Sequence, residues 1–207
     1  MITAPNLSFP WLTHGFGLRD SPPPPGLTTV KQIHSALVLD ACGRKNAQIG
    51  EGDAIISSEP GVAIGIKTAD CVPILVADSE TRLIACVHAG WRGTAANIIG
   101  RTIDELVSRG GHPKNLCVAI GPSIGSCCYE VGPDVARNFE KWQAGAGAGE
   151  RVALDLPAIN EVQLTEAGVL NVWKSGECTY CRPERFFSFR REKEQAGRML
   201  SFVNRLA

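Results

Sequence analysis

Two apolar runs joined by a polar turn occupy residues 71–88, which read CVPILVADSETRLIACVH. The runs, 72–78 and 83–88, are rich in β-branched residues and predict two strands, and the polar residues SETR between them predict a hairpin turn. Strands joined by such a turn pair antiparallel, so the start of the first and the end of the second lie at the same end of the sheet. We therefore expect Cys71 and His88 to be neighbours.

Both strand and helix patterns occur elsewhere in the chain. Further strands are predicted at 53–58, 62–67, 116–121, 169–173 and 186–190, and helices at 94–107, 133–142 and 155–167. Residues 197–206 fit either a helix or a strand. Because the order is neither strictly alternating nor all-β, the pattern predicts an α+β fold.

The bulk composition is that of a globular protein. A length of 207 residues suits a single domain over 1–207, and 44% of the residues are apolar and 20% charged. Acidic and basic residues balance at 21 each, so charge gives no argument for a nucleic acid or a membrane as partner. Eight cysteines without an export signal at the N-terminus favour reduced thiols and a cytoplasmic location. The proline run 22–25 predicts an extended connector, and residues 144–149 predict a surface loop.

Three side chains form a candidate metal or nucleophile site. Cys71 and His88 are brought together by the predicted hairpin, and His34 lies in a short apolar stretch. Small residues after His88 would let a ligand approach the backbone. Zinc binds such a Cys-His-His set and keeps a fourth position for water or substrate. The thiol and imidazole could instead form a nucleophilic pair or be structural, and the residues alone leave these alternatives open.

Two other groups near the C-terminus give weaker signals. Cys178 and Cys181 form a CxxC motif, but a zinc ribbon needs a second spaced pair, and the cysteines at 127–128 are adjacent. An Arg-Pro pair follows the motif and favours a loop, whereas a redox motif opens a helix. We therefore interpret the motif as structural, with redox or zinc chemistry as alternatives. Arg190 or Arg191 could face a phosphate.

Seven motifs, in order along the chain, are similar to those of the YfiH/laccase-domain family. They are TADCVP (68–73), VHAGWRG (87–93), IGPSIG (120–125), CCYEVG (127–132), the spaced residues DL, N and QL within 155–164, ECT (177–179) and FFSFRR (186–191). The chain is identified as a member of this family from about His14 onward. The resemblance implies mixed β-sheet layers flanked by helices. One departure is a shortened N-terminal region, because fewer residues than is usual in the family separate Arg19 from Gln32.

The resemblance also implies a function. Members of the family were first described as polyphenol oxidases and are understood as zinc-dependent purine nucleoside phosphorylases. They cleave adenosine, inosine, guanosine and methylthioadenosine with phosphate, and can also deaminate adenosine. The family pattern implies that His34, Cys71 and His88 are the metal ligands in this chain, the same set that the residues indicate.

Phosphorolysis needs cations to hold phosphate and a group near the departing purine, which makes Arg19 and Arg92 the candidate phosphate ligands. Asp70, next to Cys71, could act as an acid or base, orient the metal ligand, or cap the strand. We take Cys71, Asp70 and His88 as the candidate catalytic residues, and a purine nucleoside and phosphate as the partners.

Two alternative functions stay open. A copper-dependent, laccase-like polyphenol oxidase would use copper in place of zinc, but four histidines are too few for a blue-copper site together with a trinuclear cluster. A non-catalytic, metal-binding remnant is the other alternative. The sequence does not indicate an oligomeric state.

Overall fold

The computed structural model describes residues 1–143 and 151–207, so the loop predicted at 144–149 lies outside the described residues. The strands are β1 (Leu12–Phe16), β2 (Leu27–Lys31), β3 (Val38–Asp40), β4 (Gln48–Glu51), β5 (Ala54–Ser57), β6 (Val62–Thr68), β7 (Val72–Asp78), β8 (Ile84–Ala89), β9 (Leu116–Ile120), β10 (Glu130–Val131), β11 (Val152–Ala153), β12 (Asn171–Lys174) and β13 (Met199–Arg205). The α-helices are α1 (Trp91–Ala95), α2 (Ile98–Ser108), α3 (Pro133–Ala136), α4 (Leu156–Glu166) and α5 (Phe189–Glu192).

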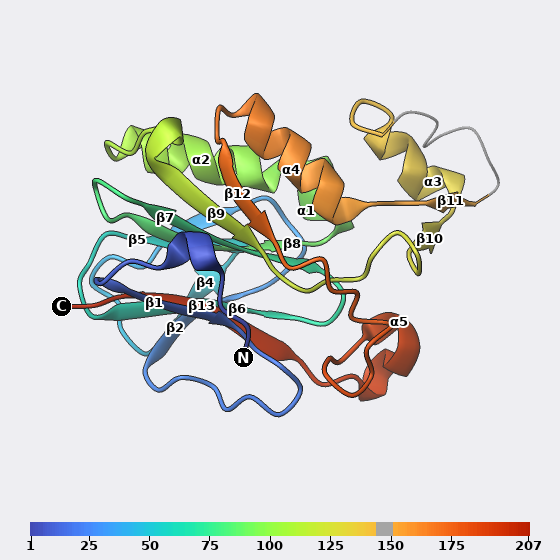
Figure 1. Cartoon of the computed structure of the whole chain (residues 1–207), viewed down its shortest axis with the longest axis horizontal. Helices are drawn as coiled ribbons and strands as arrows, with labels where there is room; N and C mark the ends of the chain where they lie inside the picture. Colours follow the sequence, from blue (N-terminus) through green and yellow to red (C-terminus); the bar gives the residue numbers. More distant parts are fainter. Residues whose placement is uncertain (144–150) are drawn as a thin grey trace.

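These elements form three layers (Figure 1). The central layer is a sheet with the strand order β12-β9-β7-β8-β5-β3. Helices α1, α2 and α4 cover one of its faces, and a second sheet with the order β1-β13-β6-β2-β4 covers the other. Both sheets contain parallel and antiparallel pairs, which confirms the predicted α+β fold with mixed sheets and flanking helices. No helix in the described part of the chain is long and apolar enough to cross a membrane.

Strand β7 lies in the middle of the core and is buried on both faces. Ile74 and Val76 pack in the cluster that joins the sheet to the helices, and Leu75 and Ala77 pack in the cluster between the two sheets. All seven residues of β7 are buried. A strand covered on both faces has no solvent-facing positions, which explains why its sequence is a continuous apolar run and does not alternate.

The hairpin predicted from residues 71–88 is confirmed. β7 and β8 pair antiparallel, with Pro73 opposite His88 and Val72 opposite Ala89. At the far end of β7, the carboxylate of Asp78 accepts hydrogen bonds from the amides of Glu80, Thr81 and His112, which holds the turn. The beginning of β7 and the end of β8 therefore lie at one end of the sheet, and the turn lies at the other.

The C-terminal strand β13 lies inside the second sheet, between β1 and β6. It pairs antiparallel with both neighbours, so residues 197–206, which fitted either element, contain a strand. β1 carries His14, whose Nε2 accepts a hydrogen bond from the Ala4 amide at 2.8 Å and ties the first residues to the sheet.

Three predicted elements need correction. The predicted strand 186–190 is wrong, because Ser188 caps the short helix α5 and its hydroxyl also donates to a buried carboxylate. The predicted helix 94–107 is two helices, since Asn97 adopts a left-handed conformation (φ 55°) and caps α2. The predicted helix 133–142 is only α3 followed by a 3₁₀ turn. The strands β1 to β4 were not predicted.

Candidate metal centre

His34, Cys71 and His88 converge at the end of the central hairpin. His34 lies in the turn after β2, Cys71 lies between β6 and β7, and His88 lies near the end of β8. One ligand atom from each of the three side chains lies within 4.8 Å of the others. The two imidazole rings meet edge to face, with their centroids 5.0 Å apart. The structure thus brings together the three residues that the sequence indicated as metal ligands.

Gln32 explains how the His34 turn reaches the hairpin. Its side-chain amide donates to the Lys67 carbonyl at 2.7 Å and accepts from the Lys67 amide at 2.8 Å. These two bonds join the turn to Lys67, near the end of β6 and shortly before Cys71. The spacing Gln-x-His therefore places an anchor two residues before an imidazole.

Asp53 organises the centre, and the sequence analysis did not identify it. Its side chain is completely buried at the start of β5. It accepts hydrogen bonds from the backbone amides of Ile33, His34 and Ser35 and from the Ser35 hydroxyl. It also lies 2.8 Å from Nδ1 of His88. One carboxylate therefore holds both histidine-bearing segments. The signal for Asp53 in the sequence was its place as an acidic residue at the start of an apolar strand.

The hydrogen bond to Asp53 determines what His88 can bind. Nδ1 of His88 donates its proton to the carboxylate, so Nε2 is the ring nitrogen left for a ligand. A carboxylate that orients a histidine in this way is the usual second partner of a zinc-bound imidazole. The donor set and its orientation therefore fit a zinc ion.

The protonation states at the centre are strongly coupled. Burial opposes the charged form of Cys71, but hydrogen bonds from His34 and His88 outweigh it and lower the pKa of Cys71 to about 6. Burial likewise disfavours a charged His88, but Asp53 and Cys71 outweigh it and raise the pKa of His88 to about 9. The pKa of Asp53 falls to about 2 against its burial, chiefly through His88 and Ser35. Without a metal, the site is therefore a thiolate beside an imidazolium.

Gly90 leaves the space in which the three ligands meet. A Cβ atom on this residue would lie 3.1 Å from the sulfur of Cys71 and 3.3 Å from Cδ2 of His34. Its φ of −73° is accessible to any residue, so the glycine is needed here for room and not for backbone freedom. The VHAGWRG motif thus supplies one ligand and the space beside it.

Asp70 lies next to Cys71, but its carboxylate points into the C-terminal segment. One oxygen accepts from the Thr179 hydroxyl at 2.6 Å. The other accepts from the Ser188 hydroxyl at 3.0 Å and from the Arg190 amide at 2.6 Å. Asp70 is buried and has a positive φ of 83°. Its contacts are those of a residue that positions the Cys71 loop.

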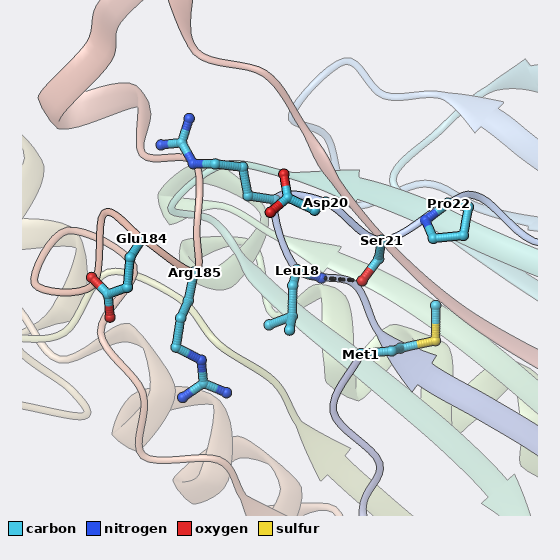
Figure 2. A pocket seen from close by; sticks show the side chains of 8 residues that line it. Met1, Leu18, Asp20, Ser21, Pro22, Glu184 and Arg185 are labelled. Atoms are coloured by element: carbon cyan, nitrogen blue, oxygen red, sulfur yellow. Dashed lines mark hydrogen bonds between the residues drawn. The ribbon is translucent and has the colours of Figure 1, made fainter.

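Arg19 is held by other residues and does not reach toward the three ligands. Its guanidinium donates to the carbonyls of Pro183 and Phe186, pairs with Glu192 and stacks over Phe187. It lines a surface pocket of about 380 Å³. Figure 2 shows Glu184 and Arg185 on one side of this pocket and Met1, Ser21 and Pro22 on the other. His34, Cys71 and His88 are not among the residues that line this pocket.

Two other arginines lie near the candidate centre. Arg92 is exposed and stacks over the Trp91 ring at 4.2 Å, and Arg190 stacks over the Tyr129 ring at 5.1 Å. Burial raises the pKa of Tyr129 to about 12, the charge of Cys71 adds to the rise, and Arg190 and Arg92 act in the opposite direction. Tyr129 is therefore within electrostatic reach of Cys71 and of both cations.

Residues 18–205 match the family model described as multi-copper polyphenol oxidoreductase laccase. The chain belongs to this family. A purine nucleoside phosphorylase of Deinococcus radiodurans is 39% identical over 181 residues, which are 84% of this chain and 68% of that protein. Purine nucleoside phosphorylase YfiH of Escherichia coli K12 is 34% identical over 179 residues, 84% of this chain and 72% of that protein.

Two further matches widen the comparison. Adenosine deaminase RL5, from an unknown prokaryotic organism, is 36% identical over 162 residues, 74% of this chain and 62% of that protein. The crystal structure of YlmD from Geobacillus stearothermophilus superposes with a TM-score of 0.86 at 27% identity and covers 99% of this chain and 94% of that chain. The fold is therefore that of YfiH-like proteins, and relatives in the family carry the names of nucleoside-processing enzymes.

Proposed function

We propose that this protein is a zinc-dependent purine nucleoside phosphorylase that cleaves adenosine, inosine, guanosine and methylthioadenosine with phosphate. The observation that supports this most is the convergence of His34, Cys71 and His88, with Asp53 orienting His88 from behind. The names of relatives in the family support this reaction class. On this proposal the enzyme works in the cytoplasm, where its thiols stay reduced.

His34, Cys71 and His88 would hold the zinc through two imidazole nitrogens and a thiolate. When bound, zinc supplies a Lewis acid with one open coordination position and lowers the pKa of a water held there. His88 gives up the proton at Nε2 to become a ligand, while its Nδ1 proton stays on the bond to Asp53. The thiolate form of Cys71 is already favoured before the metal arrives.

The chain's own cations would bind the phosphate. Phosphorolysis proceeds through a sugar with oxocarbenium character, and the attacking phosphate must be held beside the anomeric carbon. Arg92 and Arg190 both act on Tyr129, which also senses the charge of Cys71, and a guanidinium matches phosphate geometry with paired N–H donors. For Arg19, the other candidate from the sequence, phosphate must compete with Glu192.

Asp70 has a positioning role in this proposal. Both of its oxygens are hydrogen-bonded to residues of the 179–190 segment, so it joins the Cys71 loop to the backbone that carries Arg190. Movement of that segment would shift a metal ligand and a phosphate ligand together. Cys71 and His88 stay the residues next to the reacting groups.

The test is the release of hypoxanthine and ribose 1-phosphate from inosine by zinc-loaded protein. We expect product that depends on added phosphate, and its loss in Cys71→Ser and His88→Ala. Cys42→Ser is the matched control, because Cys42 is an exposed thiol that contacts Glu59 and none of the three ligands. Zinc-loaded, folded protein that forms no product with phosphate present would reject the proposal.

Adenosine deamination is the second candidate, because one relative carries that name. Zinc-bound water would be its nucleophile, so the same metal ligands are required. The assay is the appearance of inosine from adenosine without phosphate. No inosine from adenosine with zinc-loaded, folded protein in the absence of phosphate would reject this second activity.

Copper-dependent phenol oxidation is less well supported by the side chains. Nε2 of His14 accepts the Ala4 amide, and Nδ1 of His112 accepts the Lys114 amide. Two histidines are therefore committed elsewhere in the fold, and His34 and His88 alone are too few for a trinuclear cluster beside a blue-copper site. Oxygen consumption with a phenol and stoichiometric copper would revive this alternative.

A further inference from the structure

Four cysteines outside the candidate centre meet on the surface of the molecule. Cys127 and Cys128 lie in the loop after β9, and Cys178 and Cys181 lie between β12 and α5. Their sulfur atoms all lie within 4.8 Å of one another, and none of the four is in a disulfide. The adjacent pair and the CxxC pair are therefore one group, although about fifty residues separate them.

The sulfur–sulfur distances agree with a tetrahedral metal site. The sulfur of Cys181 lies 3.8 Å from that of Cys127 and 3.4 Å from that of Cys128. Four sulfurs around zinc, each at about 2.3 Å, are about 3.8 Å apart along the edges of the tetrahedron. A disulfide would need about 2.05 Å. The four thiols are thus spaced for a shared ion and not for a covalent pair.

The backbone links the two cysteine-bearing loops. The Gly125 amide, from the loop that carries Cys127 and Cys128, donates to the sulfur of Cys178 at 3.3 Å. The two loops are joined beside the cluster, because Ser123 forms a parallel bridge with Cys178 and its carbonyl accepts from the Thr179 amide at 3.0 Å. The two loops that carry the four sulfurs are therefore held together by backbone contacts, and one sulfur receives a backbone amide, as metal-bound ligands commonly do.

We propose that Cys127, Cys128, Cys178 and Cys181 bind one Zn²⁺ through four thiolates, at a site separate from the His34–Cys71–His88 centre. Binding forms four Zn–S bonds and releases the protons of the four thiols to solvent, with no change of oxidation state. Four sulfur ligands leave no open position, so the ion is structural. The proposal uses different residues from the phosphorylase proposal and stands or falls independently of it.

This site would support Asp70 from both loops. The Ile124 amide donates to the Asp70 carbonyl at 2.9 Å, and the Thr179 hydroxyl donates to its carboxylate. One of these residues belongs to each cysteine-bearing loop. An ion that crosslinks the loops therefore also limits the movement of the residue next to Cys71.

Zinc content per chain tests the proposal directly. The two clusters predict two zinc ions per chain in wild-type protein dialysed against zinc, one ion in Cys178→Ser/Cys181→Ser, and two in the control Cys42→Ser. Cys71→Ser must keep the ion of the four-cysteine site, whatever its effect on nucleoside cleavage. One zinc per chain in wild type, with no loss in the double variant, would overturn the proposal.

A measurement on the wild-type chain covers the case in which the double variant does not fold. Alkylation followed by peptide mapping should show all four thiols protected in zinc-loaded protein and reactive after chelation, while Cys42 reacts equally in both. Cobalt in place of zinc should give an intense sulfur-to-metal band that survives in Cys71→Ser. Equal alkylation with and without zinc, a Cys128–Cys181 disulfide in protein purified without oxidant, or an iron-sulfur chromophore would each refute zinc binding here.

Discussion

Replacing Asp53 with asparagine tests the proposed organisation of the metal centre. Oδ1 of Asp53 accepts from the His34 amide and faces Nδ1 of His88, while Oδ2 accepts from the Ile33 and Ser35 amides and the Ser35 hydroxyl. An asparagine can keep only one of these acceptor positions. It retains more bonds when its carbonyl takes the place of Oδ2 and its NH₂ group takes the place of Oδ1.

The consequences follow from that orientation. The NH₂ group then faces the His34 amide and His88, so two bonds to a charged acceptor are lost. At roughly 1.5–3 kcal/mol each, their loss lowers the free energy of unfolding by about 3–6 kcal/mol. Nδ1 of His88 must then accept a hydrogen bond from the new amide, so the neutral ring carries its proton on Nε2, which blocks the ligand nitrogen. We expect metal affinity to fall by about 10–100-fold.

The assay is competition for zinc with a chromogenic chelator, together with urea unfolding of the metal-free protein. Asp78→Asn is the matched control, because Asp78 is also a buried carboxylate that accepts backbone amides, but it lies at the opposite end of β7 from Cys71. It should lose stability and keep its zinc affinity. Unchanged zinc affinity in Asp53→Asn would refute the role assigned to Asp53.

Three further predictions concern space and pH. Gly90→Ala should weaken zinc binding roughly tenfold, because the new methyl group crowds Cys71, and should change the stability of the metal-free protein little. Equal zinc affinity of the variant and the wild type in chelator competition would contradict this. Burial lowers the pKa of His14 from 6.5, so unfolding takes up a proton as the pH falls below 6.5 and stability is lost there. Urea unfolding at about pH 7.5 and about pH 5 should show this loss, and His14→Gln should reduce it. Gly121→Ala would place a Cβ atom 2.2 Å from the buried ring of Phe16 and should cost about 1–3 kcal/mol in thermal unfolding, whereas an unchanged midpoint would mean that the ring can move.

The inner strands of the central sheet, β5, β7, β8 and β9, were predictable because they are buried on both faces. Such strands appear in the sequence as uninterrupted apolar runs bounded by turn residues, as in β7 and β8. The strands β1 to β4 are three to five residues long and carry polar residues such as Thr29 and Lys31, so no local pattern distinguishes them from loops. They are strands because other segments offer them partners: β13 pairs with β1, β6 with β2, β5 with β3, and β2 with β4. Such pairing is a property of the tertiary structure.

The two cysteine-containing sites differ in how far the sequence could indicate them. The hairpin gave a geometric reason for Cys71 and His88 to meet, and His34 followed from the family pattern and from the chemistry of its side chain. Asp53 has no motif of its own, and only the three-dimensional contacts reveal it. The four-cysteine group depends on a bridge between residues 123 and 178, which no local spacing predicts.

The position of β13 also affects the order in which the protein can fold. Its residues, 199–205, lie between β1 and β6 in the outer sheet, yet they leave the ribosome after every other strand in the described chain. Until then β1 has no partner and one edge of β6 stays open, whereas β5, β7, β8 and β9 can already assemble from residues 54–120. A nascent chain therefore carries an unpaired strand edge late in synthesis, and loss of these seven residues would favour aggregation.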